Sequence, residues 1–269
     1  MNALSELFGL EGKTALVTGG ATGIGRMAAT GLASAGARVL IASRKAEMCE
    51  ATAKEINALG LPGAVEGFAG DVGTEEGVAA LAEEVKARTD TLHILMNNAG
   101  TTWGKPYGQF PHFAWEKVHS VNVAGLFQLT QALTPIMVHS ATLEDPARVV
   151  NVGSVMGTAP IGAGAYSYSA SKAAVHHLTK ILATELAAKR ITVNAIAPGP
   201  FQSNMTAFAT ADAENRDRIG AKTPLGRIGA PDDIAGLMVF LCSRAGRYVT
   251  GAVIPTDGGI HVESVKELF

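Results

Sequence analysis

A tyrosine and a lysine four residues apart are the residues of this sequence best suited to chemistry. Tyr168 and Lys172 fall in a pattern that predicts a helix over 166–188, and the i,i+4 spacing places both side chains on one face. A free phenol has a pKa of about 10, which a neighbouring cation lowers by favouring the phenolate. A tyrosine tuned in this way acts as a general acid to an alkoxide or as a base to an alcohol. The same spacing is common for structural reasons, so the pair needs support from the rest of the chain.

A serine near the end of a predicted strand offers a second chemical group. Ser154 follows the apolar run 148–152, and ligands of parallel sheets bind beyond the carboxyl ends of the strands. Its hydroxyl can polarise a substrate carbonyl as an oxyanion-hole donor does. The alternative is that it only caps a helix or a turn.

A glycine-rich turn lies between the predicted strand 14–17 and the predicted helix 24–35. Residues 18–25 read TGGATGIG, and glycines let the backbone turn sharply and approach a pyrophosphate. The N-terminus of the helix presents free N–H groups to that anion. An isolated cluster of this kind favours an ordinary tight turn, but its place in the first strand–helix unit favours a dinucleotide. The residues that we expect to contact the cofactor here are Gly19, Thr22, Gly23, Ile24 and Gly25.

The residues after the second predicted strand, 38–42, indicate which dinucleotide binds. The strand leads into Ser43, Arg44 and Lys45, without the Asp or Glu that an NAD site places here for the ribose 2′-hydroxyl. The planar guanidinium of Arg44 suits a 2′-phosphate, so the sequence predicts NADP(H) in preference to NAD(H), with these three residues as contacts. The alternative is a solvated charged pair that opens a helix. Arg26 is a second candidate donor, for which a surface position is favoured.

Short apolar runs alternate with amphipathic stretches along the chain. The alternation predicts right-handed strand–helix–strand units, and hence an α/β, Rossmann-type doubly wound parallel sheet of about seven strands with helices on both faces. The predicted strands are 14–17, 38–42, 64–68, 92–96, 148–152, 191–197 and 251–254. The predicted helices are 24–35, 45–59, 74–89, 113–140, 166–188 and 231–243.

No linker, internal repeat or low-complexity segment divides the 269 residues, so we expect a single domain over 1–269. Its cofactor half covers about 1–150, and its catalytic and substrate half about 151–269. Residues 199–229 carry Gly, Pro and polar residues without a period. A long irregular segment inside a compact domain is usually a lid or binding loop, and we expect one here.

The composition excludes several kinds of partner. A net charge of -2 gives no basic excess for nucleic acid or an anionic membrane. The sequence lacks an uninterrupted apolar run of about 18 residues and the pattern of a signal peptide. Cys49 and Cys242 show no ligand spacing and suit a reducing compartment, so we expect a cytoplasmic protein. We expect no metal, because His176 and His177 have no further ligand at metal spacing.

Four motifs, in order, resemble those of the classical short-chain dehydrogenase/reductase family over nearly the full length of the chain. Residues 18–25 resemble its TGxxxGxG turn, and residues 97–100 (NNAG) resemble its segment after the fourth strand. Residues 168–172 (YSASK) resemble its YxxxK motif, and residues 198–199 its PG turn after the sixth strand. Four motifs at the expected strand ends form a specific signal.

The resemblance implies the catalytic residues. The family's catalytic tetrad matches Asn122, Ser154, Tyr168 and Lys172. Asn122 would hold a water that links Lys172 to solvent, and Lys172 would also bind the nicotinamide ribose. Ser154 and Tyr168 are 14 residues apart, slightly more than the commonest family spacing, and an extra residue around 161–164 would explain this. Ser167 and Tyr166 are the alternatives to these two.

The resemblance also implies further cofactor contacts and an assembly. Asp71 and Val72 match the family's adenine contact, and Ser203 falls where the family bonds the carboxamide. The further expected contacts are Asn98, Ala99, Gly100, Tyr168, Lys172, Pro198, Gly199 and Phe201. The family often pairs the helices here predicted at 113–140 and 166–188, which implies a homo-oligomer, expected to be a tetramer.

Apolar residues dominate the expected substrate pocket. We expect its wall to include Phe201, Met205, Phe208 and Ile219, facing Met156, Ala159 and Ile161. Trp103 belongs either to this wall or to another part of the fold. Trp115 is expected in the core. Such a wall favours a small-molecule ketone or alcohol with an apolar body.

Around 97–103, 115–123 and 149–157 the chain is similar to bacterial 3-oxoacyl reductases, including the rhamnolipid-pathway type. This similarity implies NADPH-dependent reduction of a 3-oxoacyl thioester. The alternatives are a cyclic or aryl ketone, a polyol or a sugar acid, and, outside enzymes, a nucleotide-sensing binding protein on the same fold.

Overall fold

All seven strands of the computed structural model form one parallel sheet, in the order β3-β2-β1-β4-β5-β6-β7. The structure describes residues 3–161, 164–202 and 212–262. The strands are β1 (Thr14–Thr18), β2 (Arg38–Ser43), β3 (Ala64–Ala69), β4 (Ile94–Asn97), β5 (Ala147–Val152), β6 (Ile191–Pro198) and β7 (Val253–Thr256). The predicted fold class is therefore confirmed.

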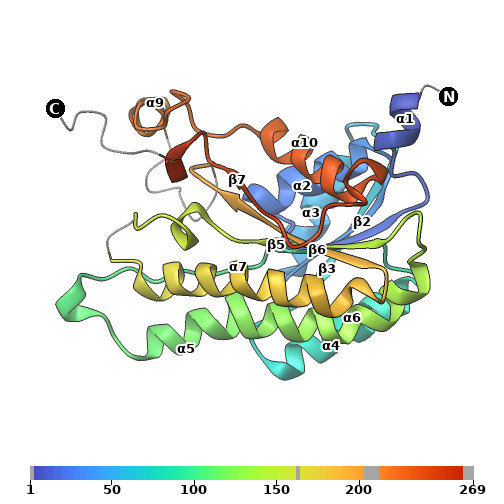
Figure 1. Cartoon of the computed structure of the whole chain (residues 1–269), viewed down its shortest axis with the longest axis horizontal. Coiled ribbons are helices and arrows are strands. Elements are labelled where there is room, and N and C mark those ends of the chain that lie inside the picture. The colour runs from blue at the N-terminus through green and yellow to red at the C-terminus, as the bar shows by residue number, and fades with distance from the viewer. Residues whose placement is uncertain (1–2, 162–163, 203–211, 263–269) are drawn as a thin grey trace.

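Helices cover both faces of the sheet (Figure 1). One layer contains α2 (Gly23–Ser34), α3 (Ala46–Asn57) and α10 (Pro231–Cys242). The other contains α4 (Glu75–Arg88), α6 (Leu126–Ser140) and α7 (Tyr166–Ala187), with α5 (Phe113–His119) continuing into α6. The remaining α-helices of the described ranges are α1 (Ala3–Phe8) and α9 (Ala213–Gly220).

Alternation of side chains along the strands builds the two cores. Ala15 and Val17 of β1 belong to the core under α2, α3 and α10, whereas Leu16 between them belongs to the core under α4, α6 and α7. All five residues of β1 are buried, as are all eight of β6. Continuous apolar strands are what a sheet covered on both faces requires, which is why the sequence pattern located them.

The strand order reverses between β1 and β4, and the ends of these strands are tied together there. The Thr18 hydroxyl accepts hydrogen bonds from the backbone N–H groups of Asn98 and Ala99, at 3.1 and 3.0 Å. The Asn98 amide donates to the carbonyls of Thr18 and Gly19, at 2.8 and 3.1 Å. In open α/β sheets the ligand binds at such a switch point, so a ligand site is expected at the ends of β1 and β4.

The segment predicted as one helix over 113–140 contains a π-turn at Ser120–Gly125, between α5 and α6. Helical periodicity does not distinguish an α-turn from a π-turn, so the sequence did not predict it. By length and mean hydropathy, 1.3, the stretch Phe113–Ser140 could cross a membrane. In the fold, however, it is a core helix, because Leu129, Leu133 and Met137 are buried against the sheet.

Several other predictions needed adjustment. The last strand is Val253–Thr256 instead of 251–254, because Gly251 has a positive φ of 76° and cannot extend the strand. Trp115 is 38% exposed, so its expected core position is wrong: Ala114 and Val118 face inward on α5, which turns Trp115 to another side. The segment 199–229 includes the helix α9, which the sequence did not predict.

Candidate active site

A cavity of about 460 Å³ opens at the carboxyl ends of β1, β4, β5 and β6. It is lined by turns that the sequence singled out for the cofactor and by three of the four expected catalytic residues. The lining residues are Gly19, Thr22, Gly23, Ile24, Asn98, Ala99, Gly100, Thr101, Thr102, Val152, Gly153, Ser154, Tyr168, Lys172, Pro198, Gly199 and Phe201. Segments far apart in the sequence thus converge on one space, as the strand ends of a doubly wound sheet must.

Lys172 is almost fully buried and is held from two sides. Its ammonium donates a hydrogen bond of 2.6 Å to the carbonyl of Val152, at the end of β5. The same nitrogen lies 5.6 Å from the centre of the Tyr168 ring, one helical turn away on α7. The predicted i,i+4 neighbours therefore share one face of the helix and face the cavity together.

Burial dominates the titration of this pair. Burial raises the pKa of Tyr168, and a hydrogen bond from Ser154 opposes that shift. Burial also lowers the pKa of Lys172 to about 8. Burial of Tyr168 thus outweighs the hydrogen bond from Ser154, so the pKa of Tyr168 lies above its ordinary value and not below it, as the sequence had suggested.

Ser154 caps a turn and also lines the cavity. Its hydroxyl accepts a hydrogen bond of 3.2 Å from the backbone N–H of Met156 and so caps the short 3-10 turn Val155–Gly157. The same side chain lines the cavity and bonds to Tyr168. These two contacts hold the Ser154 side chain beside Tyr168 at the cavity wall.

Asn122 lies behind the cavity wall, within the π-turn, and is buried. Its side chain accepts from the Thr101 N–H at 2.8 Å and donates to the Thr101 carbonyl at 3.0 Å and to the Ser171 hydroxyl at 2.9 Å. These bonds fix the segment after β4 against α7. The expected water path from Lys172 through Asn122 stays a prediction.

A second cavity of about 440 Å³ continues the first along the sheet edge and shares Gly19, Ala99, Gly100 and Thr101 with it. Ser43, Arg44, Asp71 and Val72 line this second cavity, beside β2 and β3. The structure therefore brings the expected adenosine contacts next to the expected catalytic residues.

Two expected contacts lie outside both cavities. Gly25 is buried, and a Cβ on it would lie 2.4 Å from the Gly19 carbonyl, so it serves the close packing of the turn. Lys45 is exposed at the start of α3. Ser203, Met205 and Phe208 lie outside the described residues.

Comparison with known proteins decides the family. A family model described as enoyl-(acyl carrier protein) reductase matches residues 19–261. The chain is 45% identical to the rhamnolipids biosynthesis 3-oxoacyl-[acyl-carrier-protein] reductase of Pseudomonas aeruginosa, over 95% of this chain and 98% of that protein. This chain belongs to the short-chain dehydrogenase/reductase family. It is therefore an oxidoreductase that acts on CH–OH groups with NAD(P), and the alternative of a non-catalytic nucleotide sensor is set aside.

Solved structures of similar proteins agree with this assignment. The P. aeruginosa RhlG/NADP active-site complex has a TM-score of 0.91 at 45% identity, covering 95% of this chain and 99% of that one. A putative NAD(P)-dependent gluconate 5-dehydrogenase from Beutenbergia cavernae, with bound NADP, has a TM-score of 0.85 at 37% identity, covering 95% and 99%.

The residues of this dehydrogenase/reductase fit a dinucleotide. Gly19 has a φ of 65°, and a Cβ on it would lie 2.9 Å from the Asn98 amide nitrogen, so the turn needs glycine to stay tight. Arg44 lines the cavity beside β2 and has no ion-pair partner among the described residues. Arg26 instead pairs with Glu55 at 2.8 Å, in line with its expected surface position. Arg44 is thus a cation available to an anion at this end of the site.

The sequence reading missed an aromatic cluster beside the catalytic helix. Tyr166, two residues before Tyr168, packs edge-on against Tyr107 and Phe110, with ring centres 6.1 and 5.3 Å away. Phe110 also contacts Trp115 at 5.9 Å. The signal was the density of aromatic residues over 103–115, but only the fold shows that this loop returns to the start of α7. Tyr166, the alternative acid, is therefore engaged in packing.

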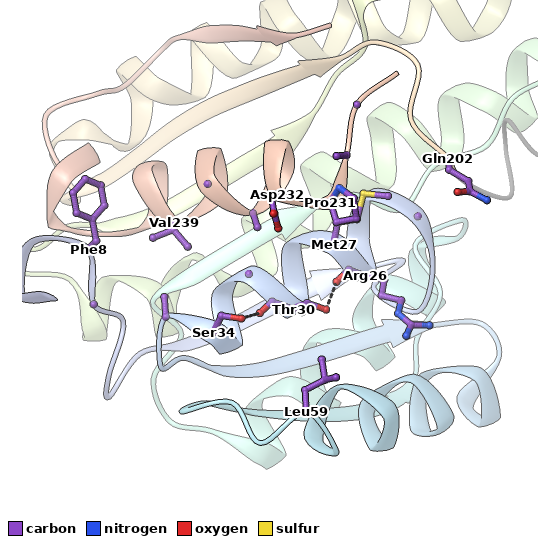
Figure 2. Close-up of a pocket in the computed structure, with 18 of the residues that line it drawn as sticks. Phe8, Arg26, Met27, Thr30, Ser34, Leu59, Gln202, Pro231, Asp232 and Val239 are labelled. Atoms are coloured by element: carbon purple, nitrogen blue, oxygen red, sulfur yellow. Dashed lines mark hydrogen bonds between the residues drawn. The ribbon is translucent and has the colours of Figure 1, made fainter. Parts of the chain in front are cut away.

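A cavity larger than either of these two lies elsewhere, between α1, α2 and α10 (Figure 2). It measures about 1310 Å³ and includes none of the expected catalytic residues. The hydroxyls of Thr30 and Ser34 along it donate to carbonyls of their own helix, at 2.9 Å each. Small residues such as Gly31 on α2 and Ala235 on α10 line this cavity, and they let the two helices pack closely there.

Proposed function

We propose that this enzyme uses NADPH to reduce a 3-oxoacyl thioester to the 3-hydroxyacyl product. The observation that carries the proposal is the convergence of Ser154, Tyr168 and Lys172 on one cavity, with an aromatic cluster packed on the first residue of the same helix, α7. The cavity supplies proton chemistry at a ketone, and the cluster supplies an apolar surface for an acyl chain. The similarity to a 3-oxoacyl-[acyl-carrier-protein] reductase supports the same substrate class.

In the proposed reaction the chain handles the proton and the developing charge. The cofactor supplies hydride to the carbonyl carbon. The Tyr168 hydroxyl gives its proton to the carbonyl oxygen, and the Ser154 hydroxyl donates a hydrogen bond to the same oxygen. The raised pKa of Tyr168 keeps the phenol protonated at neutral pH, as a proton donor must be. The Lys172 ammonium stabilises the phenolate that remains until solvent returns the proton.

The cofactor residues are proposed from their places around the two cavities. Gly19, Thr22, Gly23 and Ile24 would face the pyrophosphate, and Arg44 with Ser43 would bind the 2′-phosphate, which is the basis for preferring NADP(H). Asp71 and Val72 would contact the adenine. The residues proposed around the nicotinamide end are Asn98, Ala99, Gly100, Pro198, Gly199 and Phe201. Ser203 at that end, Lys45 near the 2′-phosphate and Gly25 in the glycine-rich turn remain predictions from the sequence.

A substrate panel tests the proposal. The purified protein with NADPH should show the highest specificity constant for 3-oxodecanoyl thioesters. The panel also contains 3-oxobutyryl and 2-enoyl thioesters, an aryl ketone and 5-ketogluconate. A clear preference for the enoyl thioester, the aryl ketone or the sugar acid would contradict the proposed substrate class.

A second candidate substrate, a sugar acid, is favoured by the similarity to a putative gluconate 5-dehydrogenase. Such a substrate carries many hydroxyls, which need polar partners in the pocket. Two residues before Tyr168 on α7, Tyr166 packs against Tyr107 and Phe110, and we expect the part of the substrate beyond the ketone to meet this aromatic surface. The aromatic surface therefore favours the acyl chain.

We further propose a cytoplasmic homotetramer assembled through α5, α6 and α7. Large apolar side chains on these helices are exposed in the single chain: Phe113, Trp115, Phe127, Val138 and Ile181. A set of apolar residues on neighbouring helices needs a partner surface to cover it. Both cysteines are free and buried, which suits a reducing compartment. Light scattering at micromolar concentration should give four times the chain mass, and a monomer would contradict this assembly.

A further inference from the structure

His176 lies one helical turn beyond Lys172 on α7, and its ring is buried inside the loop that carries Ser154. A Cβ on Gly153 would lie 2.2 Å from His176 Nε2, and a Cβ on Gly157 would lie 2.8 Å from its Cε1. Both positions therefore have to be glycine for the ring to fit. The loop around Ser154 and this imidazole are packed as a single unit.

Hydrogen bonds define how the ring is oriented. The backbone N–H of Ser154 points to His176 Nε2 at 3.4 Å, and the Thr158 hydroxyl lies 3.4 Å from Nδ1. A backbone N–H can only donate, so Nε2 accepts, and Nδ1 carries the proton and donates to Thr158. Both contacts are long for hydrogen bonds, so the packing against the two glycines shares in holding the ring.

The charge state of His176 agrees with this arrangement. Burial, together with the positive charges of Lys172 and Lys180, lowers the pKa of His176 to about 4. The imidazole is therefore neutral at neutral pH, and Nε2 keeps the lone pair that accepts the Ser154 N–H. His177, the next residue, is exposed and lacks these contacts.

We propose that His176 is a positioning residue for the proposed carbonyl reduction, and that it holds the Ser154 hydroxyl in register with Tyr168. It does not line the cavity, so it acts on the reaction only through the Ser154 peptide. The Ser154 hydroxyl has two fixed neighbours, the Met156 N–H and Tyr168, and the His176 contact fixes the backbone from which it projects. This inference rests on the proposed function.

Three substitutions at one position separate a positioning role from plain packing. In His176→Gln the side-chain amide reaches the place of Nε2 and can still accept the Ser154 N–H. In His176→Asn it reaches only the place of Nδ1, towards Thr158, and in His176→Leu neither bond forms. His177→Asn is the matched control, since the same change is made one residue away at an exposed site.

We expect a fall in kcat of about tenfold or more for the Asn and Leu variants, and of about threefold or less for the Gln variant. The Kd for NADPH should stay within about twofold of wild type in all of them, because His176 does not line the cavity and is not a proposed cofactor contact. The control should match wild type in both measurements. Such a pattern, with loss of kcat and rescue by Gln, is not expected from a residue that only fills space.

The opposite outcomes are equally clear. Equal kcat in the Gln and Asn variants would overturn the positioning role, and this comparison decides even if the Leu variant does not fold. The positioning role would also be overturned if the His176 variants lost NADPH affinity and melting temperature in proportion to their loss of kcat. A wild-type protein that reduces no ketone of the panel would instead contradict the proposed function itself, and this inference with it.

Discussion

The ammonium of Lys172 donates a 2.6 Å hydrogen bond to the carbonyl of Val152, which anchors the catalytic helix to the end of β5. This contact keeps a cation in a place from which water is excluded. The pKa of Lys172 falls to about 8 because its charged form is desolvated there. Burial of this charged group therefore reduces the stability of the fold, as perturbed ionisable groups at catalytic sites commonly do.

Because the buried ammonium of Lys172 destabilises the folded protein, we predict that Lys172→Met is more stable than wild type by an amount that depends on pH. A lysine whose folded pKa is about 8, against an ordinary value of 10.5, destabilises the fold fully below pH 8 and less as the pH rises towards 10.5. Below pH 8 this shift lowers the free energy of unfolding by an amount on the order of 3 kcal/mol. Without cofactor, the variant should melt several degrees above wild type at pH 7, and the gap should narrow by pH 10.

Lys180→Met is the control for that experiment, because Lys180 is exposed on the same helix. Its melting temperature should follow wild type at every pH. A gap between Lys172→Met and wild type that stays constant from pH 7 to pH 10 would show that burial of the charge is not its cause. The Lys172 variant should also lose turnover.

Removing the Tyr168 hydroxyl tests the proposed proton donor. Tyr168→Phe keeps the ring but has no proton to give, so kcat should fall by about a thousandfold or more, while the Kd for NADPH changes by less than about twofold. Tyr166→Phe is the matched control, because Tyr166 packs against Phe110 through its ring. Retention of a tenth of the wild-type kcat by Tyr168→Phe would exclude the assigned role.

Much of this fold was predictable because its strands are buried on both faces. A run such as 191–197 has to be apolar throughout, and the structure places β6 there. The relative position of Tyr168 and Lys172 was predictable because both belong to one helix, so their spacing places them on one face. Tertiary effects were not predictable: the burial that raises the pKa of Tyr168, the π-turn around Asn122, and the packing of Phe110 on Tyr166 all depend on segments distant in sequence.

Exchange of one charge tests the cofactor preference. Arg44→Asp removes the cation beside the second cavity and adds an acid that accepts bonds from a ribose 2′-hydroxyl. The Kd for NADPH should rise about a hundredfold, while the Kd for NADH stays equal or falls. Lys54→Asp makes the same charge change at an exposed site on α3 and should leave both constants unchanged. An equal loss for both cofactors after Arg44→Asp would refute the proposed 2′-phosphate contact.

The aromatic cluster predicts a dependence on acyl-chain length. Phe110 lies between Tyr166 and Trp115, so Phe110→Ala removes the central ring of the surface proposed to hold the chain. Burial of each methylene contributes about 0.8 kcal/mol, and only a long chain reaches the cluster beyond the reacting ketone. The specificity constant for a 3-oxodecanoyl thioester should therefore fall about tenfold, whereas that for a 3-oxobutyryl thioester should change by less than about twofold. Tyr248→Ala, which removes a fully exposed ring away from the cluster, should affect neither substrate. If Phe110→Ala lowered both constants equally, the cluster would be supporting Tyr168 instead of the chain, and the assignment of a long acyl substrate would lose its structural basis.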